Sequence, residues 1–182
     1  MNITVYCGAN VGNNPVFSEA AAELGKWMGN NGHTLVYGAG KFGMMGIVAD
    51  AVLDNGGEAI GVTPQYFIDR DETHEGLTEL FVVSNLSERR SEMMKIGNAF
   101  IALPGGMGTL DEITEIFANN RLHQFDTESG MKPAILFNVA GYYDGFLECL
   151  RQMIEKGYYR QEEYDDIIVA DSVEDIAKAL NQ

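Results

Sequence analysis

The sequence has 182 residues, of which 46% are hydrophobic, a size that suits one ordinary domain with a buried core. Its 12 Lys and Arg residues against 27 Asp and Glu residues give a net charge of -15. This excess of acid disfavours nucleic acid as a partner, because a nucleic-acid surface needs a basic face. No apolar run approaches the roughly 18 residues that a membrane span needs, so no membrane partner is expected.

The cysteines and histidines give no sign of a disulfide framework or a metal centre. Cys7 and Cys149 stand far apart, and His33, His74 and His123 show no spacing typical of ligands. A secreted disulfide scaffold would be denser in cysteine, and a zinc site would cluster its ligands. We therefore expect two reduced core thiols, no metal and a cytoplasmic location.

Strand-like and helix-like segments alternate from one end of the chain to the other. The patterns predict strands at 3–6, 34–37, 59–62, 81–83, 100–103, 134–137 and 167–169. They predict helices at 15–30, from the turn at 38–43 to about 55, and at 88–96, 110–122, 143–155 and 172–180, the last capped by Ser172. The polar stretches 65–78 and 123–131 have no period, and we expect the first to be a mobile loop over the site.

Several predicted strands, at 81–83, 100–103 and 134–137, are apolar without alternation, which is typical of strands covered on both faces. With helices between the strands, the sequence predicts an α/β fold with a doubly wound, Rossmann-like parallel sheet, in a single domain spanning 1–182. Ligands of such sheets bind beyond the carboxyl ends of the strands. Glycine turns follow the first, second and fifth strands, so we expect them to converge on one edge.

The strongest local signal is the turn at 103–109, with the sequence Leu-Pro-Gly-Gly-Met-Gly-Thr. A buried strand ends there, three glycines follow within four residues, and a helix starts. Glycine lets an anion approach the backbone amides, and the helix start adds free N–H groups and a partial positive charge. Since the overall charge repels anions, local donors such as these must hold the ligand. The pattern predicts a phosphate-binding turn.

Glu112 has two interpretations. Thr109 followed three residues later by Glu112 fits a capping box, in which the glutamate only fixes the helix start. Alternatively, the carboxylate lies beside the ligand and activates water or stabilises a developing cation. The residues alone support both interpretations equally.

Two further features carry open alternatives. The segment 38–43 matches G-x-G-x-x-G, but it follows the second strand, and the next strand has no acidic residue at its tip for a ribose. We interpret it as a second backbone wall of the same site, with an NAD site as the alternative. Arg89 and Arg90 suit bidentate contact with phosphate. Their alternative is a solvated helix face paired with Glu88 or Glu92.

The sequence resembles the Lonely Guy family, the cytokinin riboside 5′-monophosphate phosphoribohydrolases, which were long mislabelled as lysine decarboxylases. The specific part of the resemblance is an arginine in a helix, Arg89, followed by P-G-G-x-G-T-x-x-E at 104–112. Further matches in the same order, at 5–8, 37–46, 56–64 and 132–144, extend it over nearly the whole chain.

The resemblance implies hydrolysis of the N-glycosidic bond of a nucleoside 5′-monophosphate, without a cofactor and in a homodimer. By position, Arg89 and Glu112 are the expected catalytic pair, which favours the functional interpretation of Glu112. The expected substrate-binding residues are Gly8, Gly40, Arg90, Gly105, Gly106, Met107, Gly108 and Thr109. The alternative function is a non-catalytic carrier of a nucleotide or a molybdopterin-type cofactor, which would not need the catalytic pair.

The chain departs from the family pattern at two places. Ser87-Glu88 and Arg90 replace the usual Met-His and Lys, and the segment after residue 119 differs and carries an apparent insertion at 125–130. We expect these changes to lie near the base side of the pocket. There they would bear on the choice between adenine and an N6-modified adenine more than on the reaction.

Overall fold

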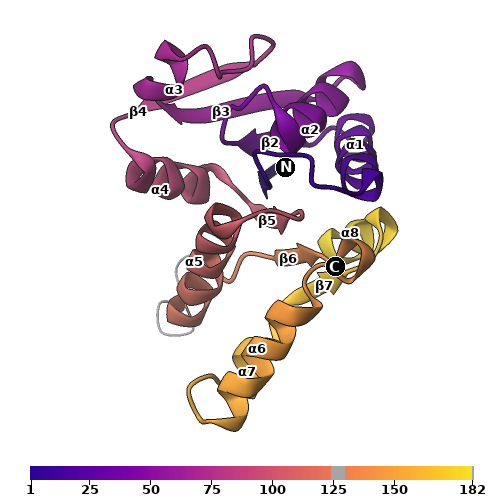
Figure 1. Ribbon diagram of the computed structural model, residues 1–182, viewed down its shortest axis with the longest axis vertical. Coiled ribbons are helices and arrows are strands. Elements are labelled where there is room, and N and C mark those ends of the chain that lie inside the picture. The colour runs from indigo at the N-terminus through magenta and orange to yellow at the C-terminus, as the bar shows by residue number, and fades with distance from the viewer. Residues whose placement is uncertain (124–129, 182) are drawn as a thin grey trace.

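Seven parallel strands form one sheet in the computed structural model, which describes residues 1–123 and 130–181 (Figure 1). The strands, in the spatial order β4-β3-β2-β1-β5-β6-β7, are β1 (Asn2–Tyr6), β2 (Thr34–Tyr37), β3 (Glu58–Pro64), β4 (Glu79–Val83), β5 (Ala99–Ala102), β6 (Ala134–Phe137) and β7 (Ile168–Ala170). The helices are α1 (Pro15–Asn30), α2 (Gly43–Asp54), α3 (Gln65–Asp69), α4 (Leu86–Ile96), α5 (Met107–His123), the 3-10 turn η1 (Val139–Gly141), α6 (Asp144–Glu155), α7 (Gln161–Asp165) and α8 (Val173–Leu180). The predicted doubly wound α/β fold is confirmed.

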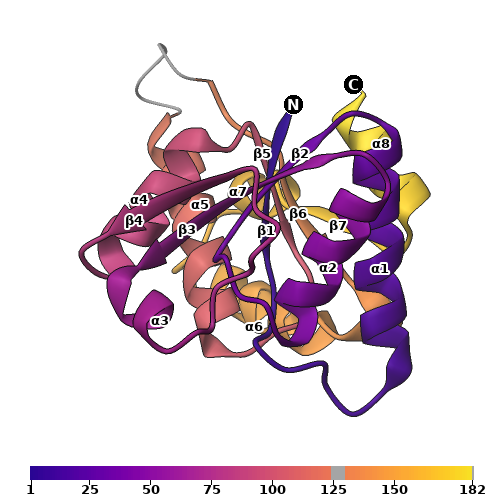
Figure 2. The ribbon, with the colours of Figure 1, turned by 90° about the horizontal axis from the view of Figure 1, so that it is seen from above.

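Helices cover both faces of the sheet (Figure 2). On one face α1, α2 and α8 bury side chains such as Leu24, Val48 and Ile176, and on the other α4, α5 and α6 bury a second cluster. Strand β5 supplies Ile101 to the first cluster and Phe100 to the second, which explains why its sequence is apolar without alternation.

The same interpretation is wrong for β4. This strand lies at the edge of the sheet, and Val82 is 52% exposed. Phe81 and Val83 pack on the α4 side, whereas the other face of β4 is only partly covered. Three apolar residues are too few to distinguish an edge strand from a central strand by sequence.

The chain reverses its direction of winding at β1. Strands β2, β3 and β4 extend from one side of β1, after which α4 brings the chain back and β5 pairs with the other side. The connections that leave β1 and β5 therefore diverge to opposite faces of the sheet. In open α/β sheets this arrangement leaves a crevice at the carboxyl ends of the two strands.

The segment 65–78 differs from its prediction as a mobile loop. It begins with helix α3, and its later part is bound to the β2–α2 turn by backbone hydrogen bonds from Lys41 N to Glu72 O (3.0 Å) and from His74 N to Ala39 O (2.8 Å). Much of the segment 123–131 lies outside the described residues.

Three other outcomes concern the ends and surfaces of helices. Ser172 caps α8 as predicted, since its hydroxyl accepts a hydrogen bond from Asp175 N at 3.2 Å. Both cysteines are free, but Cys149 is exposed on α6, so the expectation of two core thiols is wrong for it. In the part of the chain that the structure describes, no helix combines the length and apolarity of a membrane span.

Helices α1 and α2 pack closely because α1 presents glycine to its neighbour. A Cβ atom at Gly25 would lie 2.6 Å from Val48 O and 2.7 Å from Ala51 Cβ. We expect Gly25→Ala to lower the free energy of unfolding by about 1–3 kcal/mol, because α2 would have to move away. Urea denaturation measures this change.

The matched control is Gly145→Ala in α6, where an added Cβ meets no atom within 4 Å. It is expected to leave stability unchanged or to raise it by up to about 1 kcal/mol, the difference in helix propensity. Equal effects of the two substitutions would contradict the close packing of α1 on α2.

Candidate active site

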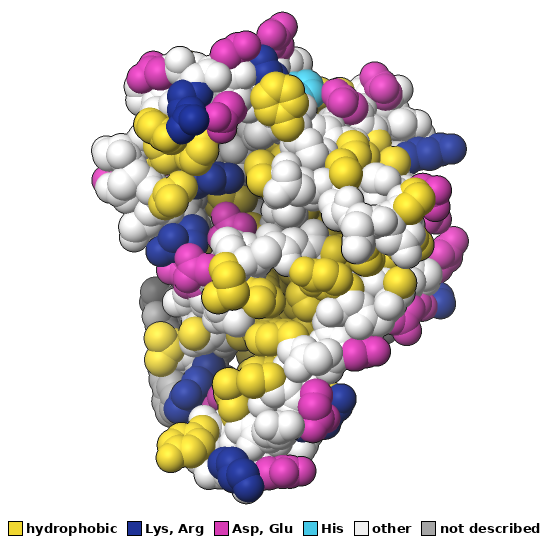
Figure 3. All heavy atoms as spheres, in the orientation of Figure 1, with side chains coloured by type: hydrophobic (Ala, Val, Ile, Leu, Met, Phe, Trp, Pro, Cys, Tyr) yellow, Lys and Arg dark blue, Asp and Glu magenta, His cyan; other side chains and the backbone are white. Residues whose placement is uncertain are grey.

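A cavity of about 600 Å³ opens at the carboxyl ends of β1 and β5, where the winding of the sheet reverses. The turns after β1, β2 and β5 all contribute to it, as the glycine pattern predicts. On the face shown in Figure 3, hydrophobic side chains gather across the middle and charged side chains lie mostly around the outline. The lining includes Tyr6, Cys7, Gly8, Phe17, Gly38, Met44, Met45, Arg89, Gly105, Gly106, Gly108, Thr109, Glu112 and Tyr142.

The turn between β5 and α5 presents a helix start to this cavity. Leu110 N donates to Gly106 O at 3.2 Å, so Gly106 is the N-cap and α5 begins at Met107. The amides of Met107, Gly108 and Thr109 precede the first intrahelical hydrogen bond, and the first turn contains no acidic residue. This local field is suited to an anion.

The three glycines of the turn differ in their surroundings. A Cβ atom at Gly105 would lie 2.1 Å from Thr109 Oγ1 and 2.8 Å from Gly8 N, so this residue is required by close packing. At Gly106 and Gly108 an added Cβ would meet nothing within 4 Å, and both residues line the cavity. The space beside these two glycines is available to a ligand.

The capping-box interpretation of Glu112 is wrong. Because α5 begins at Met107, Thr109 is the third helical residue and not the cap, and Glu112 falls in the second turn. The sequence pattern predicted the helix start at Leu110, three residues too late, because the glycines before it interrupt the apolar pattern of the helix. Glu112 instead lines the cavity beside Gly105, Gly106, Gly108 and Thr109.

The environment of Glu112 favours its neutral form. Burial raises the pKa of Glu112 from an ordinary 4.5 to about 7, and the charges of Asp111 and Glu115 add to the rise. Arg89 and Arg90 oppose it by stabilising the carboxylate. A carboxyl group with a pKa near neutrality can both accept and donate a proton at physiological pH.

Arg89 reaches the cavity from α4. Its guanidinium lies against the backbone of Gly38, where an added Cβ would fall 1.4 Å from Nη2, and over the ring of Phe67 at 5.9 Å from the centroid. Burial lowers the pKa of Arg89, and Glu112 counteracts this. Its Nε is buried and has no hydrogen-bond partner among the described residues. The solvated, paired alternative is therefore wrong for Arg89, whose guanidinium has donors to offer a ligand.

Tyr6 and Cys7 form the floor of the cavity at the end of β1. Burial raises the pKa of both side chains, and the nearby carboxyl of Glu112 raises them further. Both groups are thus held neutral. The sequence analysis includes both residues in the family match at 5–8 but assigns them no role, although their position at the end of the first strand of a doubly wound sheet marks the ligand edge.

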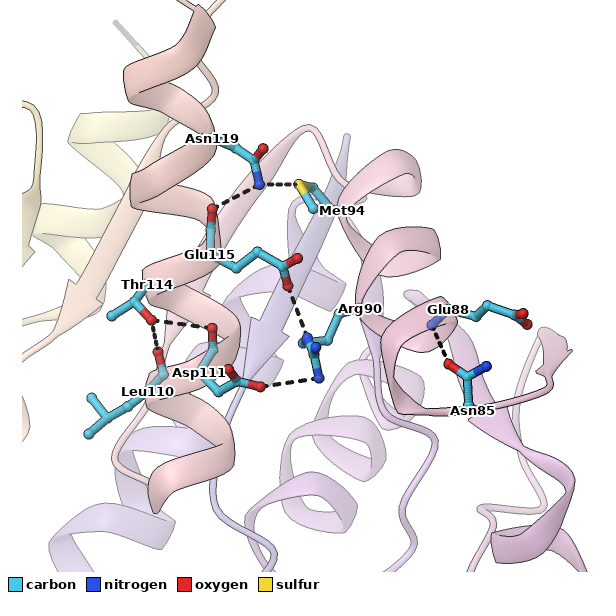
Figure 4. A network of polar contacts seen from close by, with 9 residues as sticks. All are labelled: Asn85, Glu88, Arg90, Met94, Leu110, Asp111, Thr114, Glu115 and Asn119. Atoms are coloured by element: carbon cyan, nitrogen blue, oxygen red, sulfur yellow. Dashed lines mark hydrogen bonds and ion pairs between the residues drawn. The ribbon is translucent and has the colours of Figure 1, made fainter.

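Three residues expected to bind substrate lie outside this lining: Gly40, Arg90 and Met107. Arg90 turns from the cavity toward α5, where it pairs with Asp111 at 3.1 Å and Glu115 at 3.0 Å (Figure 4). Met107 is 80% exposed. Arg90 and Arg89 are neighbours on a helix and so point in directions about 100° apart.

The departures at Ser87, Glu88 and Arg90 also lie away from the cavity. The Glu88 carboxylate accepts a hydrogen bond from Ser84 N at 2.9 Å, and Asn85 caps α4 (Figure 4). None of the three residues lines the cavity, so their expected place near the base side of the pocket stays a prediction. The apparent insertion lies mostly outside the described residues.

The G-x-G-x-x-G segment serves mainly to pack the turns together. A Cβ atom at Gly43 would lie 2.0 Å from Ala9 O, which joins this turn to the one after β1. Of its glycines, only Gly38 lines the cavity. Because the segment follows β2 rather than β1, it stands beside the crevice instead of at its centre, which disfavours the NAD alternative. Among the described residues, no group of three or more His, Cys, Asp or Glu side chains could hold a metal ion.

Comparison with known proteins identifies sequence relatives over the whole chain. The family described as "Possible lysine decarboxylase" matches residues 45–180. The cytokinin riboside 5′-monophosphate phosphoribohydrolase LOG of Oryza sativa subsp. japonica is 38% identical over 182 residues, covering 99% of this chain and 72% of that protein. The enzyme LOG1 of Arabidopsis thaliana is 37% identical, covering 98% of this chain and 81% of its own length.

Solved structures share the fold at lower identity. The molybdenum cofactor binding protein of Rippkaea orientalis has a TM-score of 0.73 at 18% identity, covering 99% of this chain and 94% of that one. The Moco carrier protein of Chlamydomonas reinhardtii has a TM-score of 0.71 at 22% identity, covering 100% and 95%. At this identity the likeness concerns the fold alone.

The pKa of Glu112 makes stability depend on pH. The folded state holds this proton up to about pH 7, whereas the unfolded state releases it near 4.5. The carboxyl therefore contributes stability below pH 4.5 that is lost as the pH rises through 7. We expect Glu112→Gln, which resembles the protonated form, to match the wild type near pH 4 and to exceed it at pH 8 by on the order of 3 kcal/mol.

Urea denaturation at the two pH values measures this difference. Glu115→Gln, on the same helix but with a partly exposed side chain, is the control and should show no such divergence. Parallel pH profiles for Glu112→Gln and the wild type would show that the carboxyl is not held in its neutral form.

Proposed function

We propose a reaction for this chain from one premise: it belongs to the family of cytokinin riboside 5′-monophosphate phosphoribohydrolases. The chain hydrolyses the N-glycosidic bond of a nucleoside 5′-monophosphate and releases a free adenine-type base and ribose 5-phosphate. One observation carries the proposal. A helix start suited to an anion, a buried carboxyl and a buried guanidinium line the same cavity.

The phosphate of the substrate binds at Gly105, Gly106, Gly108 and Thr109, with Gly8 beside them. The free amides of α5 and the Thr109 hydroxyl supply the donors. Binding of the phosphate at this turn fixes the position of the ribose, so that binding energy gained at the phosphate lowers the barrier of the reaction at C1′. The open space at Gly106 and Gly108 supports this position.

Glu112 acts at the glycosidic carbon. As the C1′–N bond breaks, its electron pair goes to the base and C1′ becomes cation-like, as at other glycosidic carbons. The ionised carboxylate stabilises that charge and accepts a proton from the water that attacks C1′. The pKa of about 7 means that a substantial fraction of Glu112 is ionised at neutral pH. The leaving base takes up one proton from solvent and Glu112 returns to solvent the proton that it accepted, so the net reaction consumes one water.

Arg89 binds the phosphate or the ribose and keeps Glu112 available as a carboxylate. Its attraction lowers the pKa of Glu112 against the effect of burial. Its position between Gly38 and the Phe67 ring restricts its rotamers, which reduces the entropy lost when a ligand binds. Arg90, Gly40 and Met107, which lie outside the lining, could contact substrate only after a rearrangement or from a second subunit.

The base side of the cavity is largely apolar. Phe17, Met44 and Met45 contribute to its walls, and such surfaces favour a flat, partly apolar base. AMP and N6-modified adenosine monophosphates are the substrates to compare. The proposal also includes one domain over 1–182, a cytoplasmic location and a homodimer, whose subunit number analytical ultracentrifugation would measure.

The role of Glu112 has a direct test. Glu112→Gln should bind AMP much as the wild type does and lower kcat by roughly 100- to 10,000-fold, since the acid–base group is lost. The assay incubates purified protein with AMP and with isopentenyladenosine monophosphate and separates base and ribose 5-phosphate by chromatography.

Glu115→Gln is the matched control, because Glu115 lies one turn further along α5 and pairs with Arg90 outside the lining. It should retain activity within about twofold, the size of a surface effect. If Glu112→Gln turned over normally, its catalytic role would be lost. If the wild type bound AMP and released no base, a carrier function would be favoured.

The phosphate position has its own test in Gly108→Ala. The added methyl meets no protein atom within 4 Å, so the folded protein should keep its melting temperature. The methyl would occupy ligand space, and we expect KM for AMP to rise about tenfold or more, as for overpacking of a tight contact. An unchanged KM would place the phosphate elsewhere.

A further inference from the structure

Two adjacent tyrosines reach from the β6–α6 connection to the phosphate turn. The Tyr142 hydroxyl donates a hydrogen bond to the carbonyl of Gly105, and the Tyr143 hydroxyl donates to the carbonyl of Leu103 at 2.7 Å. The two carbonyls stand on either side of Pro104. The turn that precedes α5 is thus held at two points by a segment that follows it by almost 40 residues.

The local backbone is shaped to deliver these side chains. Ala140 and Gly141 both have positive φ, at 51° and 72°, an uncommon conformation for Ala140 that the surroundings must enforce. Asn138 Oδ1 accepts a hydrogen bond from Tyr143 N at 2.7 Å, and Asn138 Nδ2 donates to Asp144 Oδ1 at 2.9 Å. These bonds fix the chain before and after the two tyrosines.

The ring of Tyr142 is itself held in place. It contacts Phe17 edge-to-face at 5.7 Å between centroids and Tyr143 edge-to-face at 5.1 Å. Both geometries are favourable for aromatic pairs. Tyr143 is fully buried, whereas Tyr142 is 44% exposed and lines the cavity. The hydroxyl of Tyr142 is therefore rigidly placed at the edge of the site.

The peptide that Tyr142 holds joins two glycines. The unit between Gly105 and Gly106 has glycine on both sides, so it can rotate at little steric cost. In a trans peptide the carbonyl and the following N–H point in opposite directions. Holding Gly105 O therefore also fixes the direction of Gly106 N–H.

We propose that Tyr142 is a positioning residue for the substrate's phosphate, acting through the Gly105–Gly106 peptide, and this rests on the proposed function. Its hydroxyl keeps Gly105 O turned away from the anion and Gly106 N–H turned toward it. A carbonyl oxygen facing the phosphate would repel it. The hydroxyl thus selects the orientation of the peptide that binds.

Without the hydroxyl, the Gly105–Gly106 peptide would populate both orientations. The apparent affinity for a phosphate group falls in proportion to the fraction of molecules that remain competent. One hydrogen bond biases such an equilibrium by about fivefold. The base side of the cavity does not depend on this peptide and should be unaffected.

The experiment compares Tyr142→Phe with the wild type, and Tyr158→Phe, whose side chain is 85% exposed, is the control. Calorimetry measures the Kd of ribose 5-phosphate and of adenine, two fragments that report on the two ends of the site. Kinetics with AMP gives KM and kcat, and thermal unfolding gives the melting temperature.

In Tyr142→Phe we expect the Kd of ribose 5-phosphate and the KM of AMP to rise by about two- to fivefold, the upper value applying if the competent orientation is the minor one without the hydroxyl. The Kd of adenine, kcat and the melting temperature should stay close to the wild type, and Tyr158→Phe should change none of these values. A merely structural role would lower the melting temperature and weaken both fragments together.

Several results would overturn the proposal: an unchanged affinity of Tyr142→Phe for ribose 5-phosphate, equal weakening of both fragments, or a wild type that does not bind ribose 5-phosphate. Failure of the proposed function gives a different result, namely a wild type that binds ribose 5-phosphate and releases no base from AMP. In that case the calorimetric comparison still tests Tyr142.

Discussion

The pairing of β1 with β5 is the contact on which the candidate site depends. It continues beyond the regular ladder, with Leu103 N donating to Tyr6 O at 2.9 Å and Gly8 N donating to Pro104 O at 3.1 Å. These bonds bring the end of the first strand to the glycine turn before α5, although almost 100 residues separate the two segments. Only glycine at 105 permits this approach, because a side chain there would strike both Thr109 and Gly8. The reversal of the sheet then leaves the crevice beside them.

The proposed function requires an anion to bind in a protein of net charge -15, and burial of the site makes the two compatible. Inside the cavity, nearby dipoles and charges act through a lower effective dielectric than the distant surface carboxylates, which solvent and salt screen. The same burial disfavours the charged forms of Glu112 and Arg89, and each of these charges stabilises the other. A phosphate that enters would find the guanidinium donors and the amides of α5 already in place.

The sequence predicted the fold well because the strong periods of its helices and its apolar strands agree with one another. Helix α1 and strands β2 and β6 have the boundaries that the pattern predicts. The edge position of β4 and the short helices α3 and α7 were missed, since a few residues carry too little periodicity. For the site, the glycine turn, Arg89 and Glu112 were available from the sequence. Tyr6, Cys7 and Tyr142 lie in segments that match the family, but the sequence assigned them no role, because only the tertiary fold brings them to the turn.

The fold alone does not separate a hydrolase from a carrier, since molybdenum cofactor binding proteins share it at 18–22% identity. A phosphate-binding turn would be useful to either a hydrolase or a carrier. The buried carboxyl of Glu112 is different. It does not cap α5, and above pH 7 its charge lowers the stability of the folded state. A carrier gains nothing from such a group beside an anion, which it would repel. Its presence in a cavity that also contains Arg89 is expected where a carboxylate must stabilise a cation that develops during reaction.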